Sequence, residues 1–175
     1  MAVRKALHLA DIRYSLKARR IGMGGSLRLL MEARLAGITP SLALALRQQE
    51  SGIQGDGNVF GHDPTIFAGA GKVTKAKYLA YKKKRGSHGQ GGMQGVGPLQ
   101  LTYYAFQDEA DKMGGCWKPA NNYRVGYRLL ASLIHKHGER KGLAVYNGGE
   151  ASPNYHYADS VLGFKRRWHR VLFGR

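Results

Sequence analysis

The sequence contains one cysteine, Cys116, and no long apolar run. A single cysteine excludes an intramolecular disulfide and a cysteine-rich zinc site. No apolar stretch approaches the ~18–20 residues that a membrane-spanning helix needs. The first segment, Met1 to Arg20, mixes basic and acidic side chains and lacks the apolar core of a secretory signal peptide. We also find no internal repeat, so disulfide scaffolds, membrane-spanning proteins and repeat arrays are excluded.

Acidic residues are scarce as well. The 175 residues include 11 Asp and Glu against 28 Lys and Arg, which gives a net charge of +17. Hydrophobic residues make up 43% and charged residues 22%, a balance typical of globular proteins. Such a charge predicts a polyanionic partner, which composition alone leaves open between nucleic acid, a membrane surface and an anionic wall polymer.

The apolar spacing and the glycine positions predict a mainly α-helical protein. We expect one domain over residues 1–175, with N-terminal helices in 1–38 and a Gly-rich insertion in 53–97 that contains a short hairpin near 58–72. Thr102 is expected to cap one helix, and Asn121 or Asn122 the next. The helices are expected over residues 3–20, 26–35, 40–51, 74–84, 102–113, 121–137, 139–146 and 155–172.

One carboxylate stands out by its position. The segment Leu42 to Leu46 is apolar on every face, which is typical of a buried helix, and that helix ends in Glu50, Ser51 and Gly52. Burial and the negative end of the helix dipole both disfavour ionisation of Glu50, so its pKa should be raised. A carboxyl group that stays protonated near neutral pH can serve as a general acid. The alternative is a surface glutamate that merely ends a helix.

An ordered series of short motifs follows along the chain. The motifs are Glu50-Ser51-Gly52, Gly97 to Thr102 (GPLQLT), Asn122 with Gly126-Tyr127, Ala144 to Gly149 (AVYNGG), and Tyr157 to Leu162 (YADSVL). Together they resemble the lysozyme-like superfamily, in particular the soluble lytic transglycosylase domain shared with goose-type lysozymes and many phage endolysins. The resemblance covers about residues 39–165. It implies a lysozyme-like α-helical domain, with the Gly-rich insertion beside the active-site cleft.

The resemblance implies a peptidoglycan-cleaving glycosidase. Glu50 would be the catalytic acid and base on the β-1,4 bond between N-acetylmuramic acid and N-acetylglucosamine. Ser51 would support the geometry of Glu50, and Gln100 would line the substrate groove. Tyr146 would place its hydroxyl within bonding reach of Glu50.

Two further substrate-binding residues are implied. Asn147 would bond an acetamido group or hold its loop, and Tyr157 would complete the wall beside the cleaved bond. Core packing is an alternative role for Tyr146 and Tyr157, and a helix-ending turn is one for Asn147-Gly148-Gly149.

A second carboxylate would favour hydrolysis. Asp63, thirteen residues after Glu50, is the first candidate, and Asp56 the second. Asp63-Pro64 is also a common turn pair. Transglycosylases of this family need no second carboxylate, since the acetamido group of the substrate assists and a 1,6-anhydro ring closes. Hydrolysis and anhydro-ring formation therefore both stay open.

We expect no metal and no cofactor. His135 and His137 have no accompanying ligand pattern, and the loop 86–97 lacks the Lys-Ser/Thr ending of a phosphate-binding loop. The expected partners are bacterial peptidoglycan and, through the basic surface, anionic wall polymers. The protein is expected to act as a monomer. If the protein is a phage endolysin, we expect it in the host cytoplasm until it is released to the wall. Alternatively, it is the catalytic domain of a larger wall-acting protein.

Two other functions remain as alternatives. A non-catalytic basic module could bind nucleic acid or an anionic wall polymer. It would use the lysine-rich stretch 72–85, in which Tyr78 and Tyr81 are interleaved with basic residues. A structural phage or wall-associated protein with a degenerate lysozyme-like core is the third reading.

Overall fold

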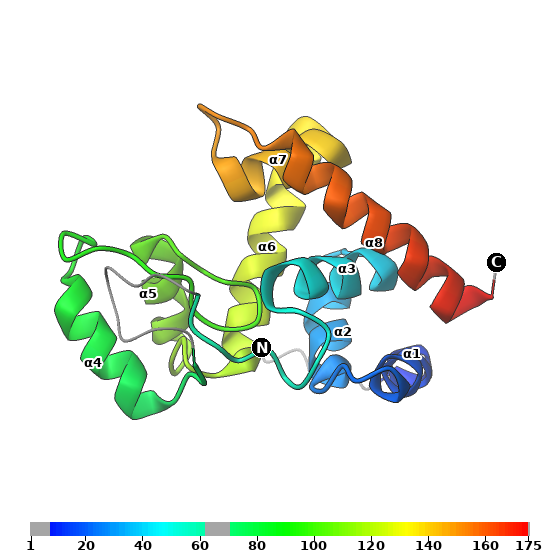
Figure 1. Ribbon diagram of the computed structural model, residues 1–175, viewed down its shortest axis with the longest axis horizontal. Coiled ribbons are helices and arrows are strands. Elements are labelled where there is room, and N and C mark those ends of the chain that lie inside the picture. The colour runs from blue at the N-terminus through cyan, green and yellow to red at the C-terminus, as the bar shows by residue number, and fades with distance from the viewer. Residues whose placement is uncertain (1–7, 62–70, 175) are drawn as a thin grey trace, which may run out of the picture.

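Helices dominate the described chain, which comprises residues 8–61 and 71–174 of this computed structural model. The predicted mainly α-helical fold class is confirmed, because the pairings outside helices in these residues are isolated bridges. Figure 1 shows the helices in order. They are α1 (Leu9–Arg20), α2 (Ser26–Leu35), α3 (Pro40–Ser51), α4 (Lys75–Arg85), α5 (Tyr104–Lys112), α6 (Pro119–His137), α7 (Glu139–Gly148) and α8 (Tyr155–Phe173).

Two predicted helix starts are wrong. Helix α5 begins at Tyr104, and the hydroxyl of Thr102 donates to the carbonyl of Gln100 instead of capping the helix. Helix α6 begins at Pro119, whose missing N–H and fixed φ suit a first helical position. Asn121 and Asn122 therefore lie inside α6, where their side chains bond neighbouring loops. The remaining predicted helices are present with ends shifted by at most two residues, except the first, where α1 begins at Leu9 and residues 3–7 of the expected helix lie outside the described residues.

The hairpin expected near 58–72 is described only at its ends. Val59 and Lys72 form an antiparallel bridge, and Phe60 forms another with Val96. Residues 62–70 lie outside the described residues, and with them the candidate Asp63. The hairpin and the role of Asp63 therefore stay predictions.

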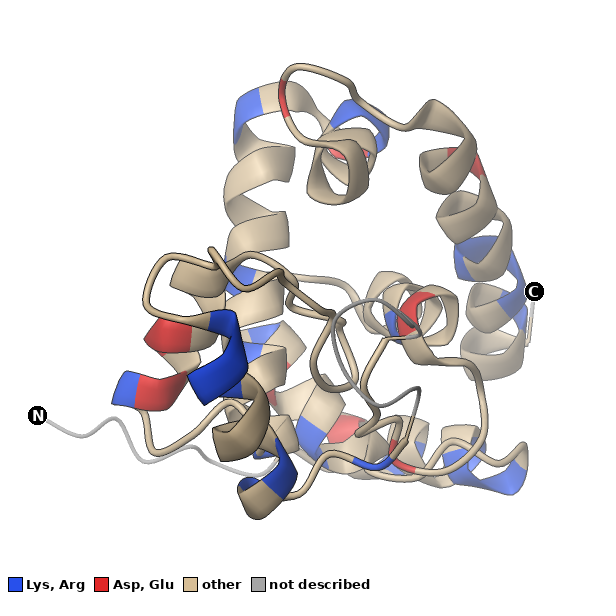
Figure 2. Ribbon diagram, turned by 60° about the vertical axis from the view of Figure 1, so that its left-hand side comes forward, with Lys and Arg blue, Asp and Glu red and all other residues tan. Residues whose placement is uncertain are grey.

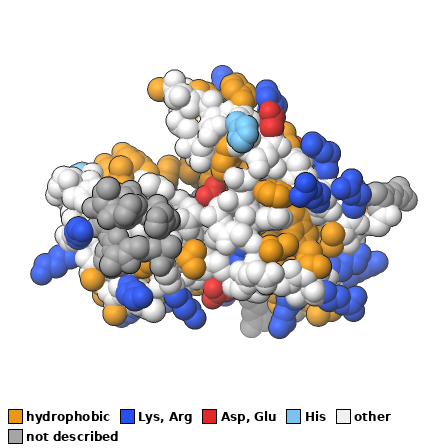
Figure 3. Space-filling view, in the orientation of Figure 1, with side chains coloured by type: hydrophobic (Ala, Val, Ile, Leu, Met, Phe, Trp, Pro, Cys, Tyr) orange, Lys and Arg blue, Asp and Glu red, His pale blue; other side chains and the backbone are white. Residues whose placement is uncertain are grey.

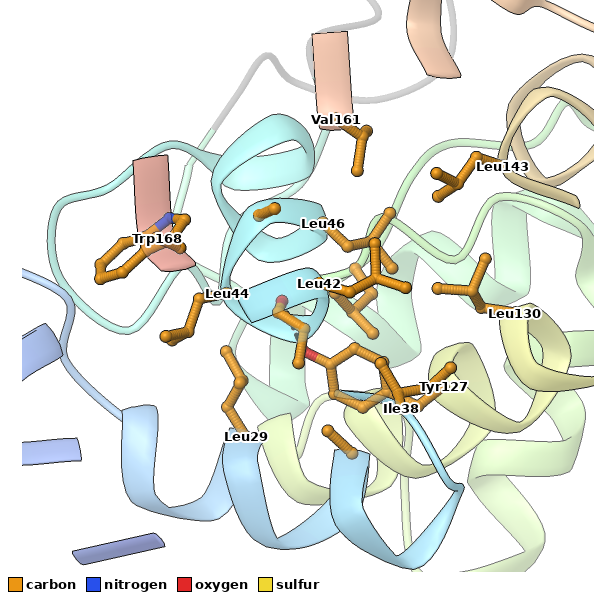
Figure 4. Close-up of a cluster of buried hydrophobic side chains, with 14 of the residues drawn as sticks. Leu29, Ile38, Leu42, Leu44, Leu46, Tyr127, Leu130, Leu143, Val161 and Trp168 are labelled. Atoms are coloured by element: carbon orange, nitrogen blue, oxygen red, sulfur yellow. Dashed lines mark hydrogen bonds between the residues drawn. The ribbon is translucent and has the colours of Figure 1, made fainter. Parts of the chain in front are cut away.

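Helix α3 forms the centre of the larger hydrophobic core, as its all-round apolar sequence predicts (Figure 4). Leu42, Leu44 and Leu46 are buried, and the α3 backbone accepts a hydrogen bond from Tyr127 of α6, whose hydroxyl lies 3.0 Å from the Ala43 carbonyl. Helices α2 and α8 both pack against α3. Burial of one such leucine stabilises a fold by about 2 kcal/mol, so α3 holds its last turn, and with it Glu50, firmly in place.

A smaller core lies under α4 and α5. Tyr78 and Tyr81 of α4 are completely buried in it; the Tyr78 hydroxyl donates to Asp111 at 2.9 Å. Arg85 is also fully buried and donates to Gln107 at 2.7 Å. The two tyrosines are therefore unavailable for stacking on nucleotide bases, which corrects the expectation that they alternate with lysines on a binding surface.

Helix α6 connects the two cores. Its Val125 belongs to the smaller core, while Tyr127 and Leu130 belong to the larger one. Arg124 of α6 also binds the buried carboxylate of Glu32 on α2 through two contacts of 3.1 and 3.2 Å. Glu32 is thus a buried ion-pair partner. No helix in the described part of the chain has the length and apolar character needed to cross a membrane.

Candidate active site

Arg47 binds the chain that follows the last turn of α3. Its side chain is fully buried and donates to the backbone carbonyls of Gly52, Gln54 and Gly55, the latter two at 3.3 and 3.0 Å. A cation at a helix C-terminus also complements the helix dipole. Gly57 lies so close that an added Cβ would come within 2.4 Å of the guanidinium. Arg47 therefore fixes the chain that leaves the helix directly after Glu50.

Glu50 is half-buried, and burial raises the pKa of its carboxyl group from 4.5 to about 7. This confirms the predicted direction of the shift. The hydroxyl of Tyr157, a buried residue on α8, donates a hydrogen bond to Glu50 and partly offsets the increase. The carboxyl group is therefore held by one donor and is substantially protonated at neutral pH.

Tyr146 lies near Glu50, as expected, but its hydroxyl bonds another group. Its hydroxyl donates to the carbonyl of Leu99 at 3.1 Å. The Leu99 residue is fully buried, so its backbone oxygen needs a protein donor. The charge of Glu50 nevertheless contributes to raising the pKa of Tyr146, after burial, so the two side chains are neighbours. Tyr157 takes the bonding role that was expected of Tyr146.

Ser51 joins the end of α3 to the loop that precedes Gln100. Its hydroxyl lies 2.7 Å from the carbonyl oxygen of Pro98, to which it donates. From the other side, the side-chain oxygen of Asn122 accepts from the Leu99 backbone N–H at 2.8 Å. Gly126 of α6 lets this loop approach, because a Cβ there would lie 2.6 Å from a Leu99 methyl group. The supporting role predicted for Ser51 agrees with this geometry.

Gln100 has a backbone φ of 45°, a left-handed conformation that is unusual for a residue other than glycine. Its side-chain nitrogen donates to the carbonyls of Val59 and Gly97, at 3.0 and 2.7 Å. These bonds hold the strained residue in place. Strained residues of this kind cluster at functional sites, and no local sequence pattern indicated the strain at Gln100.

A cavity of about 420 Å³ opens beside Glu50. The predicted residues Glu50, Gln100, Tyr146 and Asn147 all line it, whereas Ser51 and Tyr157 are not among its lining residues. Figure 3 shows a hollow in this region of the surface, between the part built on α4 and α5 and the part built on α7. The other lining residues are Met93, Leu101, Thr102, Tyr103, Phe106, Leu129, Leu133, Val145, Gly149 and Glu150.

The chemistry of this lining is mixed. Asn147 is exposed, and its side-chain oxygen accepts a hydrogen bond from the side-chain amide of Asn154 at 2.8 Å. This bond links the end of α7 to the start of α8. Amide groups, hydroxyls and aromatic rings beside an apolar wall suit a ligand that has both polar groups and apolar faces. Sugars carrying acetamido groups are ligands of this kind.

Glu150 at the cavity is a feature that the sequence did not reveal. It contacts Lys136 at 2.7 Å and His137 at 2.9 Å, and hydrogen bonds from these two residues lower its pKa to about 2. The cavity therefore contains one carboxyl group with a raised pKa and one with a lowered pKa. Within residues 8–61 and 71–174, no group of three or more His, Cys, Asp or Glu side chains could hold a metal ion.

Comparison with known proteins finds no family model, no curated protein and no solved structure that matches the chain.

Proposed function

We propose that the protein is a peptidoglycan-cleaving glycosidase with Glu50 as its general acid. The observation that carries the proposal is the environment of Glu50: a carboxyl group at the end of a buried helix, with a pKa of about 7 and a hydrogen bond from Tyr157, beside a cavity. The ordered motifs that resemble the lysozyme-like superfamily support the same reaction. The bond to be cleaved is the β-1,4 link between N-acetylmuramic acid and N-acetylglucosamine.

In this mechanism the protonated Glu50 donates its proton to the bridging oxygen as the glycosidic bond breaks. The resulting carboxylate accepts a hydrogen bond from Tyr157 and is stabilised by it. The same carboxylate then takes a proton from the attacking group. That group is a water molecule in hydrolysis, or the 6-hydroxyl of the muramic acid in anhydro-ring formation. Both routes require Glu50 to begin in the protonated form.

The basic surface gives the proposed enzyme an attraction to its substrate. Peptidoglycan carries peptide carboxylates, and walls carry attached phosphate polymers, so a protein with a net charge of +17 is attracted to the wall. Lys75, Lys77, Lys83 and Lys84 are exposed on α4, away from Glu50. We assign these charges to association with the wall, as expected of an endolysin that acts after reaching it.

The test compares two glutamate-to-glutamine variants on a suspension of purified cell walls. Glu50→Gln cannot donate the proton, and because general acid catalysis contributes about 10²–10⁴-fold, we expect its clearing rate to fall at least ~100-fold. Glu109→Gln makes the same chemical change at an exposed position on α5 and should clear walls at the normal rate. Undiminished clearing by Glu50→Gln would reject the proposal.

A further inference from the structure

Helix α1 has two opposite faces. Asp11, Ser15 and Ala18, spaced by four and three residues, are buried, and Ser15 meets Ser26 of α2 at 3.0 Å. Leu9, Arg13, Leu16 and Arg20, each two positions from one of these, lie about 200° around the helix from them. Leu16 also lines a hollow together with Leu27 and Met31 of α2. The outward face presents a repeat of leucine and arginine: Leu9, Arg13, Leu16 and Arg20.

The apolar members of this face are unusually exposed. Leu9 is 84% exposed and Leu16 is 53% exposed. Arg13 and Arg20 are exposed as well, and neither forms an ion pair among the described residues. The acid of the same helix, Asp11, is buried and already bound to Arg34 at 2.9 Å. The positive charge of the outward face is therefore uncompensated along α1.

The C-terminal end of α8 lies beside α1. Lys17 of α1 donates to the Leu172 carbonyl at 2.5 Å, and the Tyr14 ring meets the Phe173 ring edge-on at 5.3 Å. Phe173 is 41% exposed. Arg166 and Arg170 precede it at helical spacing, and Figure 2 shows Lys and Arg on α8 near the C-terminus.

We name this surface the α1–α8 face. The face comprises Leu9, Arg13, Leu16, Arg20, Arg166, Arg170 and Phe173.

We propose that the α1–α8 face binds the surface of an anionic phospholipid bilayer. Arginine side chains bind lipid phosphates, while leucine and phenylalanine side chains beside them enter the boundary between headgroups and acyl chains. A soluble polyanion would use the arginines but would leave Leu9 and Leu16 in water. The combination of exposed apolar and unpaired cationic side chains on one face therefore favours a bilayer. The protein lies on the bilayer in this arrangement.

The experiment measures co-sedimentation of the protein with vesicles of 30% phosphatidylglycerol and 70% phosphatidylcholine. We expect binding that weakens as salt is added, and no binding to vesicles of pure phosphatidylcholine. Each arginine near an anionic membrane contributes enough for about a fivefold change in affinity. Arg13→Gln with Arg20→Gln should thus weaken binding about 25-fold. The matched control, Lys83→Gln with Lys84→Gln, removes the same charge from α4 and should bind nearly as the parent does.

A second pair of variants separates a bilayer from a soluble polyanion. Leu9→Ser with Leu16→Ser alters exposed side chains only, so folding should be unaffected. We expect this pair to weaken vesicle binding about tenfold and to leave binding to soluble polyphosphate unchanged. The proposal is overturned if anionic vesicles are not bound, if the leucine pair leaves vesicle binding intact, or if the α4 control weakens binding as much as the arginine pair does. Wall cleavage is measured separately, so failure of either proposal is recognised independently.

Discussion

Replacing Glu50 with glutamine should stabilise the protein at alkaline pH and leave its stability at acid pH nearly unchanged. The folded protein holds the Glu50 pKa at about 7, against an ordinary value of 4.5. A raised folded-state pKa means that the folded state binds the proton more tightly than the unfolded chain. This contribution to stability is complete below pH 4.5 and is lost as pH rises through 7. Glutamine carries no charge at any of these pH values.

The magnitude follows from the two pKa values. Their difference, at 1.36 kcal/mol per pH unit, corresponds to about 3 kcal/mol of unfolding free energy. For a protein of this size each kcal/mol moves the melting temperature by about 2–4 °C. Above pH 8 the Glu50→Gln variant should therefore melt about 6–12 °C higher than the parent, whereas near pH 4 the two should melt together.

The assay is thermal unfolding followed by circular dichroism, with both proteins measured at pH 4.0 and at pH 8.5. Comparison at the same pH cancels the effects of all other titrating groups. Glu109→Gln provides the control, because the Glu109 side chain is exposed. This variant should melt at the same temperature as the parent, both at pH 4.0 and at pH 8.5. An equal difference between parent and Glu50→Gln at pH 4.0 and 8.5 would refute the claim that burial perturbs this carboxyl group.

Three further substitutions test the surroundings of the site. Tyr157→Phe removes a hydrogen bond that lowers the Glu50 pKa. Hydrogen bonds to charged groups contribute about 1.5–3 kcal/mol, so the pH at which the wall-clearing rate falls on the alkaline side should rise by about one to two units. An unchanged pH would contradict this. Gly126→Ala forces a methyl group against the loop that this glycine contacts, so wall clearing should fall at least tenfold, measured by turbidity. Glu32→Ala leaves Arg124 without its buried carboxylate and should cost about 3–5 kcal/mol in urea unfolding.

Local sequence patterns predict much of the fold. The apolar run ahead of Glu50 predicted a buried helix over residues 40–51, and Gly52 marked its end correctly, because glycine readily adopts the positive φ that ends this helix. The starts of α5 and α6 were missed for a related reason. Thr102 and Asn122 have the side chains of helix caps, but both donate to other carbonyls: Thr102 to that of Gln100, two residues earlier, and Asn122 to that of the distant Val96.

The sequence predicted which residues lie at the candidate site better than it predicted the hydrogen bonds between them. Helix position alone indicated the raised pKa of Glu50, since burial was visible in the sequence. The choice of Tyr157 over Tyr146 as its partner depends on how α7 and α8 pack, which no local pattern encodes. The buried anchor Arg47 was missed because an arginine near the polar end of a helix usually faces solvent. The strain at Gln100 likewise arises from contacts with residues distant in the sequence.

Mass spectrometry of digested peptidoglycan tests directly whether Glu50 is the general acid of a glycosidase. We expect the parent protein to release fragments that end at N-acetylmuramic acid, Glu109→Gln to release them normally, and Glu50→Gln to release none. A reducing muramic acid end would identify hydrolysis and direct attention to Asp63, whereas a 1,6-anhydro end would identify attack by the substrate itself. Absence of glycan cleavage by the parent protein, or the same fragments from Glu50→Gln, would contradict the account.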